Sequence, residues 1–191
     1  MTRCYTFFMH QVAETPRLYL RWLEPADAPF ILALLNEPGW LRFIGQMQVK
    51  TEADALGYLQ KGPLKMYQER GFGLYGVALK STGELIGLCG LIKRPTLPDV
   101  DLGFAFLAHF CGQGYAFEAA QACVALAREP FRLARLVAIT DSDNRRSIHL
   151  LTRLGMVFET QVQLTESAPL LDLFALNWPA QAESGILEQA R

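Results

Sequence analysis

The sequence lacks the long apolar runs and the one-signed charge that mark membrane proteins and nucleic-acid-binding proteins. No uninterrupted apolar stretch approaches the about 20 residues of a membrane-spanning helix. The apolar patch from Tyr5 to Met9 is too short for a signal-peptide core and has no small-residue cleavage site. The 18 Lys and Arg residues nearly balance the 19 Asp and Glu residues, and the net charge is −1. We therefore expect neither a nucleic-acid nor a membrane partner.

Cysteine is scarce, and its spacing is not that of a metal or redox motif. No two of the four cysteines form a C-x-x-C pair; they are Cys4, Cys89, Cys111 and Cys123. A chain of this length builds a core without disulfides, so we expect free thiols in a reducing compartment, the cytoplasm. His10 and His149 have no paired ligand residues nearby, so no metal site is expected.

The length and composition predict one globular domain. The chain has 191 residues, of which 51% are hydrophobic and 19% are charged. This balance excludes general disorder. The sequence contains no repeat, low-complexity tract or linker, so we expect a domain at 15–178 between an N-terminal tail at 1–14 and a C-terminal tail at 179–191. Either a monomer or a homodimer is compatible with the sequence.

Hydrophobic periodicity predicts a mixed α/β (α+β) fold. Period-two or β-rich runs predict seven strands, at 17–23, 72–79, 85–92, 101–106, 133–140, 156–165 and 170–178. Helical spacing and capping signals predict helices at 26–36, 116–129 and 144–154, and one at 51–70 with an irregularity at Gly62-Pro63. The aromatic segment 40–44 has no clear period, so we expect a loop whose side chains fill the core rather than line a pocket.

The segment 101–120 is a strand that leads through a glycine loop into a helix. Gly112 and Gly114 allow several backbone N–H groups to point at one place, and the helix that begins near Ala116 adds the positive end of its dipole. A pyrophosphate suits such a site. The same G-x-G is equally typical of a plain strand-to-helix turn. Neither a P-loop nor a complete dinucleotide fingerprint is present, which disfavours nucleoside triphosphates and nicotinamide cofactors.

A second motif follows the next predicted strand. It is a helix with Asn144 and Ser147 in its first turn, closed by Leu154-Gly155. Together the two segments resemble the acetyl-CoA-binding motifs of the GCN5-related N-acetyltransferase (GNAT) superfamily. Arg17-Leu-Tyr-Leu-Arg21 and Gly83-Glu-Leu-Ile-Gly87 make the sequence most similar to the branch that contains the ribosomal-protein alanine N-acetyltransferases. The chain departs from the family pattern, without losing a backbone donor, at His109, Cys111 and Met156.

The resemblance covers nearly the whole predicted domain and implies a fold and a reaction. The implied fold is a mostly antiparallel seven-stranded sheet with helices on both faces and a splayed central strand pair. The implied reaction moves an acetyl group from the co-substrate acetyl-CoA to a primary amine by direct attack. The acceptor is either a protein N-terminus or a small-molecule amine.

The resemblance also assigns residues to the donor. Backbone groups of three strand residues are expected to bind the pantetheine arm, namely Phe104, Phe106 and Leu107. The glycine loop and the first helical residues are expected to hold the pyrophosphate, namely Gly112, Gln113, Gly114, Tyr115 and Ala116.

Asn144 matches a family position that contacts the pantetheine arm, and Ser147 matches a hydroxyl near the thioester sulfur. The residues themselves also allow other roles. The Asn144 side chain is a good helix cap, and both roles can coexist. Ser147 is otherwise an ordinary exposed helix serine.

The implied chemistry needs a group that accepts the proton of the attacking amine. Asp101 is the first candidate, because strand alternation places it on one face with Gly103 and Ala105. An acidic residue that opens a strand is also typical of a solvated end. Cys111 is excluded as a nucleophile, because no His with an Asp or Asn partner accompanies it at a known spacing.

The acceptor site is the part that the sequence determines least. Contacts are expected from 22–44 and from the turn near Ser167. Three acidic residues near the first helix either bind a basic acceptor or form a solvated face, namely Glu24, Asp27 and Glu37. Arg145 and Arg146 are expected to face the 3′-phosphate of CoA. The alternative function is a non-catalytic acyl-CoA-binding or sensing module that keeps the fold without the base.

Overall fold

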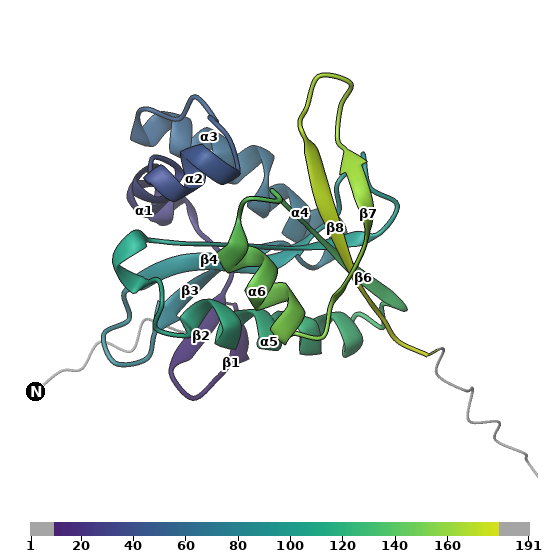
Figure 1. The fold of residues 1–191 in the computed structure, drawn as a ribbon. Coiled ribbons are helices and arrows are strands. Elements are labelled where there is room, and N and C mark those ends of the chain that lie inside the picture. The colour runs from purple at the N-terminus through teal and green to yellow at the C-terminus, as the bar shows by residue number, and fades with distance from the viewer. Residues whose placement is uncertain (1–9, 180–191) are drawn as a thin grey trace, which may run out of the picture.

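The computed structural model describes residues 10–179 as one eight-stranded sheet with helices on both faces (Figure 1). The spatial strand order is β1-β2-β3-β4-β5-β6-β8-β7. The strands are β1 Gln11–Glu14, β2 Leu18–Arg21, β3 Leu74–Leu79, β4 Leu85–Ile92, β5 Val100–Phe106, β6 Arg135–Thr140, β7 Val157–Gln163 and β8 Leu170–Asn177. The α-helices are α1 Ala28–Leu35, α2 Pro38–Phe43, α3 Glu52–Lys61, α4 Pro63–Arg70, α5 Tyr115–Arg128 and α6 Arg145–Arg153.

The central strands β5 and β6 are parallel and separate soon after they meet. They pair only at Val100 with Leu136 and at Asp101 with Val137. Beyond this point β5 follows β4 up to Phe106, while β6 follows β8 up to Thr140. All other neighbouring strands are antiparallel. The predicted mixed fold with a splayed central pair is therefore confirmed.

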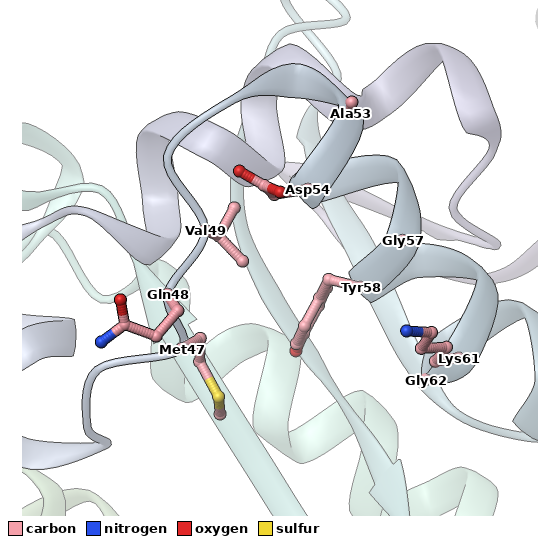
Figure 2. Close-up of a pocket in the computed structure, with 9 residues that line it drawn as sticks. All are labelled: Met47, Gln48, Val49, Ala53, Asp54, Gly57, Tyr58, Lys61 and Gly62. Atoms are coloured by element: carbon pink, nitrogen blue, oxygen red, sulfur yellow. The ribbon is translucent and has the colours of Figure 1, made fainter.

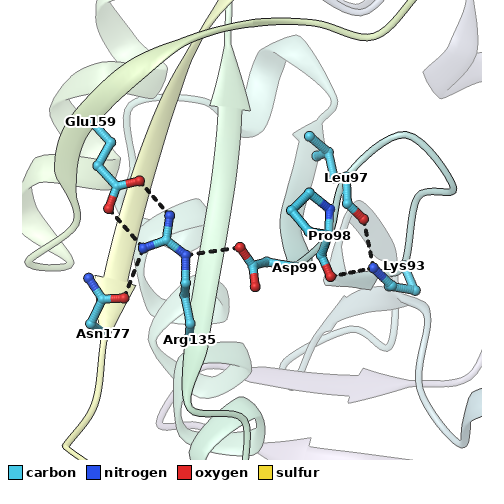
Figure 3. A network of polar contacts seen from close by, with 7 residues as sticks. All are labelled: Lys93, Leu97, Pro98, Asp99, Arg135, Glu159 and Asn177. Carbon is cyan, nitrogen blue, oxygen red and sulfur yellow. Dashed lines mark hydrogen bonds and ion pairs between the residues drawn. The ribbon is translucent and has the colours of Figure 1, made fainter.

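The paired end of β5 and β6 is held by a polar network around Arg135 (Figure 3). The Arg135 side chain donates to Asp99 (2.9 Å), to the side-chain oxygen of Asn177 (2.9 Å) and to the carboxylate of Glu159. These contacts tie the start of β6 to the β4–β5 loop and to the two outer strands β7 and β8. The sheet is braced at one end of the central pair and open at the other.

Small residues let α5 pack closely on one face of the sheet. Four of its side chains are fully buried and join the main core with β2, β3, β4 and β5, namely Ala119, Ala120, Cys123 and Ala127. Leu151 of α6 is buried in the same cluster. The helices α1 and α3 form a second cluster with Leu88 and Ala105 on the other face. The splayed strands thus lie between two helical layers.

The structure corrects two parts of the prediction. Gln11–Glu14 lies in the segment expected to be a tail, and it forms the edge strand β1 beside β2, so the sheet has eight strands rather than seven. A run of four residues is too short for periodicity to identify. The segment expected to be a loop at 40–44 belongs largely to α2, which starts with Pro38 at a position that favours proline. Trp40 is buried, as expected of a core residue, whereas Ile44 of the same segment is exposed, so the expectation holds only in part.

Other predicted elements are found close to their expected limits. The irregularity at Gly62-Pro63 divides the predicted helix at 51–70 into α3 and α4. No helix among residues 10–179 is long and apolar enough to cross a membrane. Cys4, the patch from Tyr5 to Met9 and the C-terminal tail from residue 180 onward lie outside the described residues.

Candidate functional site

The glycine loop turns the chain from the end of β5 into α5. A 3₁₀ turn at Ala108–Phe110 precedes it. Gly112 and Gly114 have φ of +77° and +83°, in the left-handed region that other residues rarely adopt. The first helical hydrogen bond closes between the N–H of Glu118 and the carbonyl of Gly114 (3.1 Å). The N–H groups before Glu118 have no partner within the helix, so the loop presents free donors at the positive end of the helix dipole.

An ion pair from Arg17, the residue just before β2, fastens this loop, and no local pattern in the sequence indicates it. Glu118, in the first turn of α5, accepts hydrogen bonds from the Thr15 hydroxyl (2.6 Å), the Arg17 N–H (2.9 Å) and Arg17 Nε (2.7 Å). Arg17 Nη1 donates to the carbonyl of Gln113 (3.0 Å), and its guanidinium lies 4.4 Å from the centre of the Tyr115 ring. Burial raises the pKa of Glu118, but these hydrogen bonds and the Arg17 charge outweigh it and leave the pKa below its ordinary value.

The residues expected to bind pantetheine lie along the edge of β5 that β6 leaves. The N–H of Leu107 donates to the carbonyl of Ile86 in β4 (3.0 Å). Because backbone groups alternate sides along a strand, those of Phe104 and Phe106 face the opening. The Leu107 carbonyl already accepts from the N–H of Phe110 (3.0 Å). Leu107 therefore has fewer free backbone groups for a ligand than Phe104 and Phe106 have.

Helix α6 begins with the two polar residues that the sequence singled out. The Asn144 side-chain oxygen accepts from the N–H of Ser147 (3.1 Å), which confirms the capping interpretation. Ser147 is only 9% exposed, so the interpretation as an ordinary exposed helix serine is wrong. Its hydroxyl has no hydrogen-bond partner among residues 10–179. A nearly buried hydroxyl without a partner remains available to a bound molecule.

Asp101 occupies the last position at which β5 pairs with β6. It is 1% exposed, which rules out a solvated strand end. Arg94 Nε donates to its carboxylate at 2.6 Å. Burial raises the pKa of Asp101, while the Arg94 charge, its hydrogen bond and the N–H of Ile139 oppose this rise. Ala105, on the same side of β5 by strand alternation, packs against the cluster of α1 and α3, so Asp101 faces that layer.

A pocket of about 560 Å³ lies between α3 and the segment that precedes it (Figure 2). Tyr58 extends from α3 toward Met47 across this space. Burial raises the pKa of Tyr58 to about 12, and the nearby charge of Arg94 opposes this rise. Tyr58 thus borders the pocket and lies near Arg94, the residue that pairs with Asp101. The pocket lies beyond the range 22–44 from which acceptor contacts were expected.

The acidic residues near the first helix do not form a free carboxylate cluster. Asp27 is buried and accepts two hydrogen bonds from the Arg21 guanidinium, at 2.8 and 2.7 Å. It also accepts from the N–H of Glu24 (2.8 Å). Its charge is therefore neutralised inside the fold, and the interpretation of these residues as a binding site for a basic acceptor loses Asp27.

The remaining candidates are Cys111 and the residues that could hold a metal ion. Burial raises the pKa of the Cys111 thiol, an effect that the Arg146 charge opposes and the Glu37 charge reinforces. The thiol therefore stays protonated, in agreement with its exclusion as a nucleophile. Arg146 lies close enough to the loop to act on Cys111. No group of three His, Cys, Asp or Glu residues within 10–179 is arranged to hold a metal ion.

The sequence is similar to those of known acetyltransferases. A protein-family model described as an acetyltransferase (GNAT) domain matches residues 17–157. YoaA of Bacillus subtilis, an N-acetyltransferase by name, is 26% identical over 148 residues, which are 77% of this chain and 83% of YoaA. YkkB of the same organism is 26% identical over 155 residues, 78% of this chain and 87% of its own length.

Solved structures show the same fold. An acetyltransferase from Agrobacterium tumefaciens superposes with a TM-score of 0.74 at 26% identity, covering 93% of this chain and 100% of its own. RimL, the ribosomal L7/L12 α-N-protein acetyltransferase, was solved in complex with coenzyme A; it superposes with a TM-score of 0.75 at 18% identity, covering 88% of this chain and 98% of its own. The family match spans β5, the glycine loop and α6. The chain therefore belongs to the GNAT acetyltransferase family.

Proposed function

We propose that this chain transfers the acetyl group of acetyl-CoA directly to a primary amine bound beside it. The observation that carries the proposal is the glycine loop at the start of α5, at the far end of the β5 edge that β6 leaves unpaired. Free N–H groups and a helix dipole favour an anion at one place, and unpaired strand edges favour an amide-bearing arm beside it. A pyrophosphate joined to pantetheine has both features.

The chain binds the donor mainly through its backbone. The N–H groups of the loop and of the first helical turn hold the pyrophosphate, namely those of Gln113, Gly114, Tyr115 and Ala116. Gly112 supplies the turn that brings them together. Phe104 and Phe106 pair with the amides of the arm as a neighbouring strand would. Asn144 keeps its amide nitrogen for the arm while its oxygen caps α6.

The side chains at the opening supply the proton transfers. Asp101 accepts the proton that the ammonium group must lose before the amine nitrogen can attack the thioester carbonyl. Burial raises the pKa of this carboxylate, and the charge and hydrogen bond of Arg94 oppose the rise and so favour the ionised form. The Ser147 hydroxyl donates a proton to the departing thiolate. Backbone N–H groups near the opening stabilise the developing oxyanion, and no covalent acyl-enzyme is needed.

The acceptor is a protein N-terminus or a small-molecule amine. Proteins of the same fold are named for acceptors and roles of both kinds, RimL for a ribosomal protein N-terminus and MccE for self-immunity to microcin C7. The pocket beside Tyr58 opens on the face toward which Asp101 points. The three described cysteines are free thiols, which supports the reducing cytoplasmic compartment expected from the sequence.

A screen for thiol release tests this function. The full-length protein and acetyl-CoA are incubated with N-terminal peptides of ribosomal proteins and with a panel of small amines. Release of free CoA that depends on one acceptor, with an acetylated product in the mass spectrum, supports the proposal. Tight acetyl-CoA binding without turnover on any acceptor supports the alternative, a non-catalytic acyl-CoA-binding module.

A further inference from the structure

The positively charged guanidinium of Arg17 is held in a fixed position beside the glycine loop. Its Nε pairs with the carboxylate of Glu118 (2.7 Å), its Nη1 donates to the carbonyl of Gln113 (3.0 Å), and its guanidinium lies 4.4 Å from the centre of the Tyr115 ring. The side chain is nevertheless 46% exposed. Three contacts on different groups fix the plane of the guanidinium without covering it.

One edge of this guanidinium is free and is directed at the loop. The second terminal nitrogen, Nη2, has no hydrogen-bond partner among residues 10–179. A Cβ built on Gly114 would lie 3.3 Å from Nη2, so the free N–H groups border the space above that glycine. An arginine side chain has five N–H donors, and the hydrogen bonds to Glu118 and to the carbonyl of Gln113 use only two of them.

The charge arrangement also calls for an anion at this position. A cation near the N-terminus of a helix is disfavoured by the helix dipole. Glu118 offsets the charge of Arg17 on one side, yet the free edge and the N–H groups of the loop present positive potential to the same space. The loop contains no cation of its own, because residues 111–114 are Cys-Gly-Gln-Gly. The Gln113 side chain is turned back to the carbonyl of His109 (2.8 Å).

We infer that Arg17 donates from Nη2 to the pyrophosphate of the bound acyl donor, across Gly114. The inference rests on the proposed function and adds a side-chain cation from the turn before β2 to a site otherwise built from backbone donors. Arg17 then has two roles: it fastens the loop through Glu118 and Gln113, and it neutralises phosphate charge. The first role alone would be structural, so the test must separate the two.

Donors with and without phosphates show whether Arg17 acts on the phosphate-bearing part of the donor, and Glu118→Gln shows whether it acts only through the shape of the loop. The dissociation constants of acetyl-CoA and 3′-dephospho-acetyl-CoA are measured by calorimetry, and that of S-acetylpantetheine by NMR titration, for the wild type and Arg17→Gln. We expect Arg17→Gln to weaken both nucleotide donors about 10- to 100-fold, the loss of one charge-assisted hydrogen bond. S-acetylpantetheine, which has no phosphate, is expected to bind equally well to both proteins.

Further variants control for the loss of charge and for a failure to fold. Lys65→Gln removes the same unit of charge from α4, where Lys65 pairs with Glu69 (3.6 Å). Its affinities for all three donors should equal those of the wild type. If Arg17→Gln does not fold, Arg17→Lys keeps the charge but not the fork of donors, and it should weaken the nucleotide donors by a smaller factor than the full loss while sparing S-acetylpantetheine.

Several outcomes overturn the inference. The same loss for both nucleotide donors in Glu118→Gln, which breaks the ion pair that fastens the loop but keeps the Arg17 charge, means that Arg17 only shapes the loop. A loss confined to the donor with a 3′-phosphate assigns Arg17 to that phosphate instead, and unchanged affinities remove it from the site. A wild-type protein that binds no CoA derivative defeats the proposed function itself. This last result differs from the other three, because it concerns the wild type and not the variant.

Discussion

Replacing Gly114 with alanine should damage acetyl-CoA binding more than it damages the fold. Gly114 has φ of +83°, and an L-residue in this region costs about 1–2 kcal/mol. Gly71, which ends α4 with φ of +74°, carries the same backbone penalty far along the chain from the loop. Gly114→Ala and Gly71→Ala should therefore lower the free energy of unfolding by similar amounts. For a domain of this size, this is a fall in Tm of roughly 2–8 °C.

The two variants differ in what the new methyl group meets. No atom lies within 4 Å of a Cβ built on Gly71, whereas a Cβ on Gly114 lies 3.3 Å from Arg17 Nη2. The methyl group at Gly114 occupies the space in which the loop, Arg17 and a phosphate would meet. Loss of one hydrogen bond to a charged group costs about 1.5–3 kcal/mol. The dissociation constant for acetyl-CoA should therefore rise about 10- to 100-fold.

Calorimetry with acetyl-CoA and thermal unfolding of both variants measure these two quantities separately. Gly71→Ala should change Tm and leave the dissociation constant within about twofold of the wild type, which is less than 0.5 kcal/mol. Gly114→Ala should change both. If Gly114→Ala lowers Tm but binds acetyl-CoA as the wild type does, or if both variants lose the same affinity, the loop does not hold the pyrophosphate and the reasoning fails.

Three further predictions concern the proton transfers and the ion pair between Arg17 and Glu118. Ser147→Ala should lower kcat about 100-fold or more while the KM for acetyl-CoA changes little, and wild-type turnover would remove its role as an acid. Arg94→Gln removes the charge that opposes the burial of Asp101, so the pKa of Asp101 should rise and the acid limb of the kcat/KM profile should move to higher pH; an unmoved limb would exclude Asp101 as the base. Because the pKa of Glu118 is lower in the folded chain than in the unfolded chain, its contribution to stability is present above the ordinary carboxyl pKa of 4.5 and is lost as pH falls through the lowered value. Glu118→Gln should abolish this part of the acid dependence in urea unfolding, and an unchanged dependence would assign it elsewhere.

The sequence was sufficient to predict the elements whose limits depend on one dominant local signal. Helix α5 was predicted to within one residue at each end, because a glycine loop precedes its alanine-rich run and Pro130 follows it. Strand β5 was found because its apolar residues end at a loop with two glycines. The splay of β5 from β6 came only from the resemblance, since no local pattern records where two strands stop pairing.

Contacts between distant residues were beyond the reach of sequence spacing. Arg17 and Glu118 are 101 positions apart, and nothing near either residue indicates the other. The burial of Asp101 was also missed, because an acid at a strand end is solvated unless other parts of the chain cover it, and here Arg94 and β6 do so. Likewise, only the folded chain shows that Ser147 turns inward.

The proposed donor site and the acceptor site depend on different kinds of group, and this explains why the sequence suggests residues for one and not for the other. In the proposed site, the donor is bound by backbone N–H groups, whose position is encoded by glycine spacing and a helix start. Acceptor binding depends on which side chains remain free on the α1–α3 face. There Asp54 borders the pocket but accepts hydrogen bonds from the Thr51 N–H (2.9 Å) and the Thr51 hydroxyl (2.8 Å), and Asp27 is held by Arg21. Asp27 is thus neutralised inside the fold, whereas Asp54 is exposed and accepts these bonds through only one of its two oxygens, so a cationic acceptor at this face would find Asp54 and not Asp27.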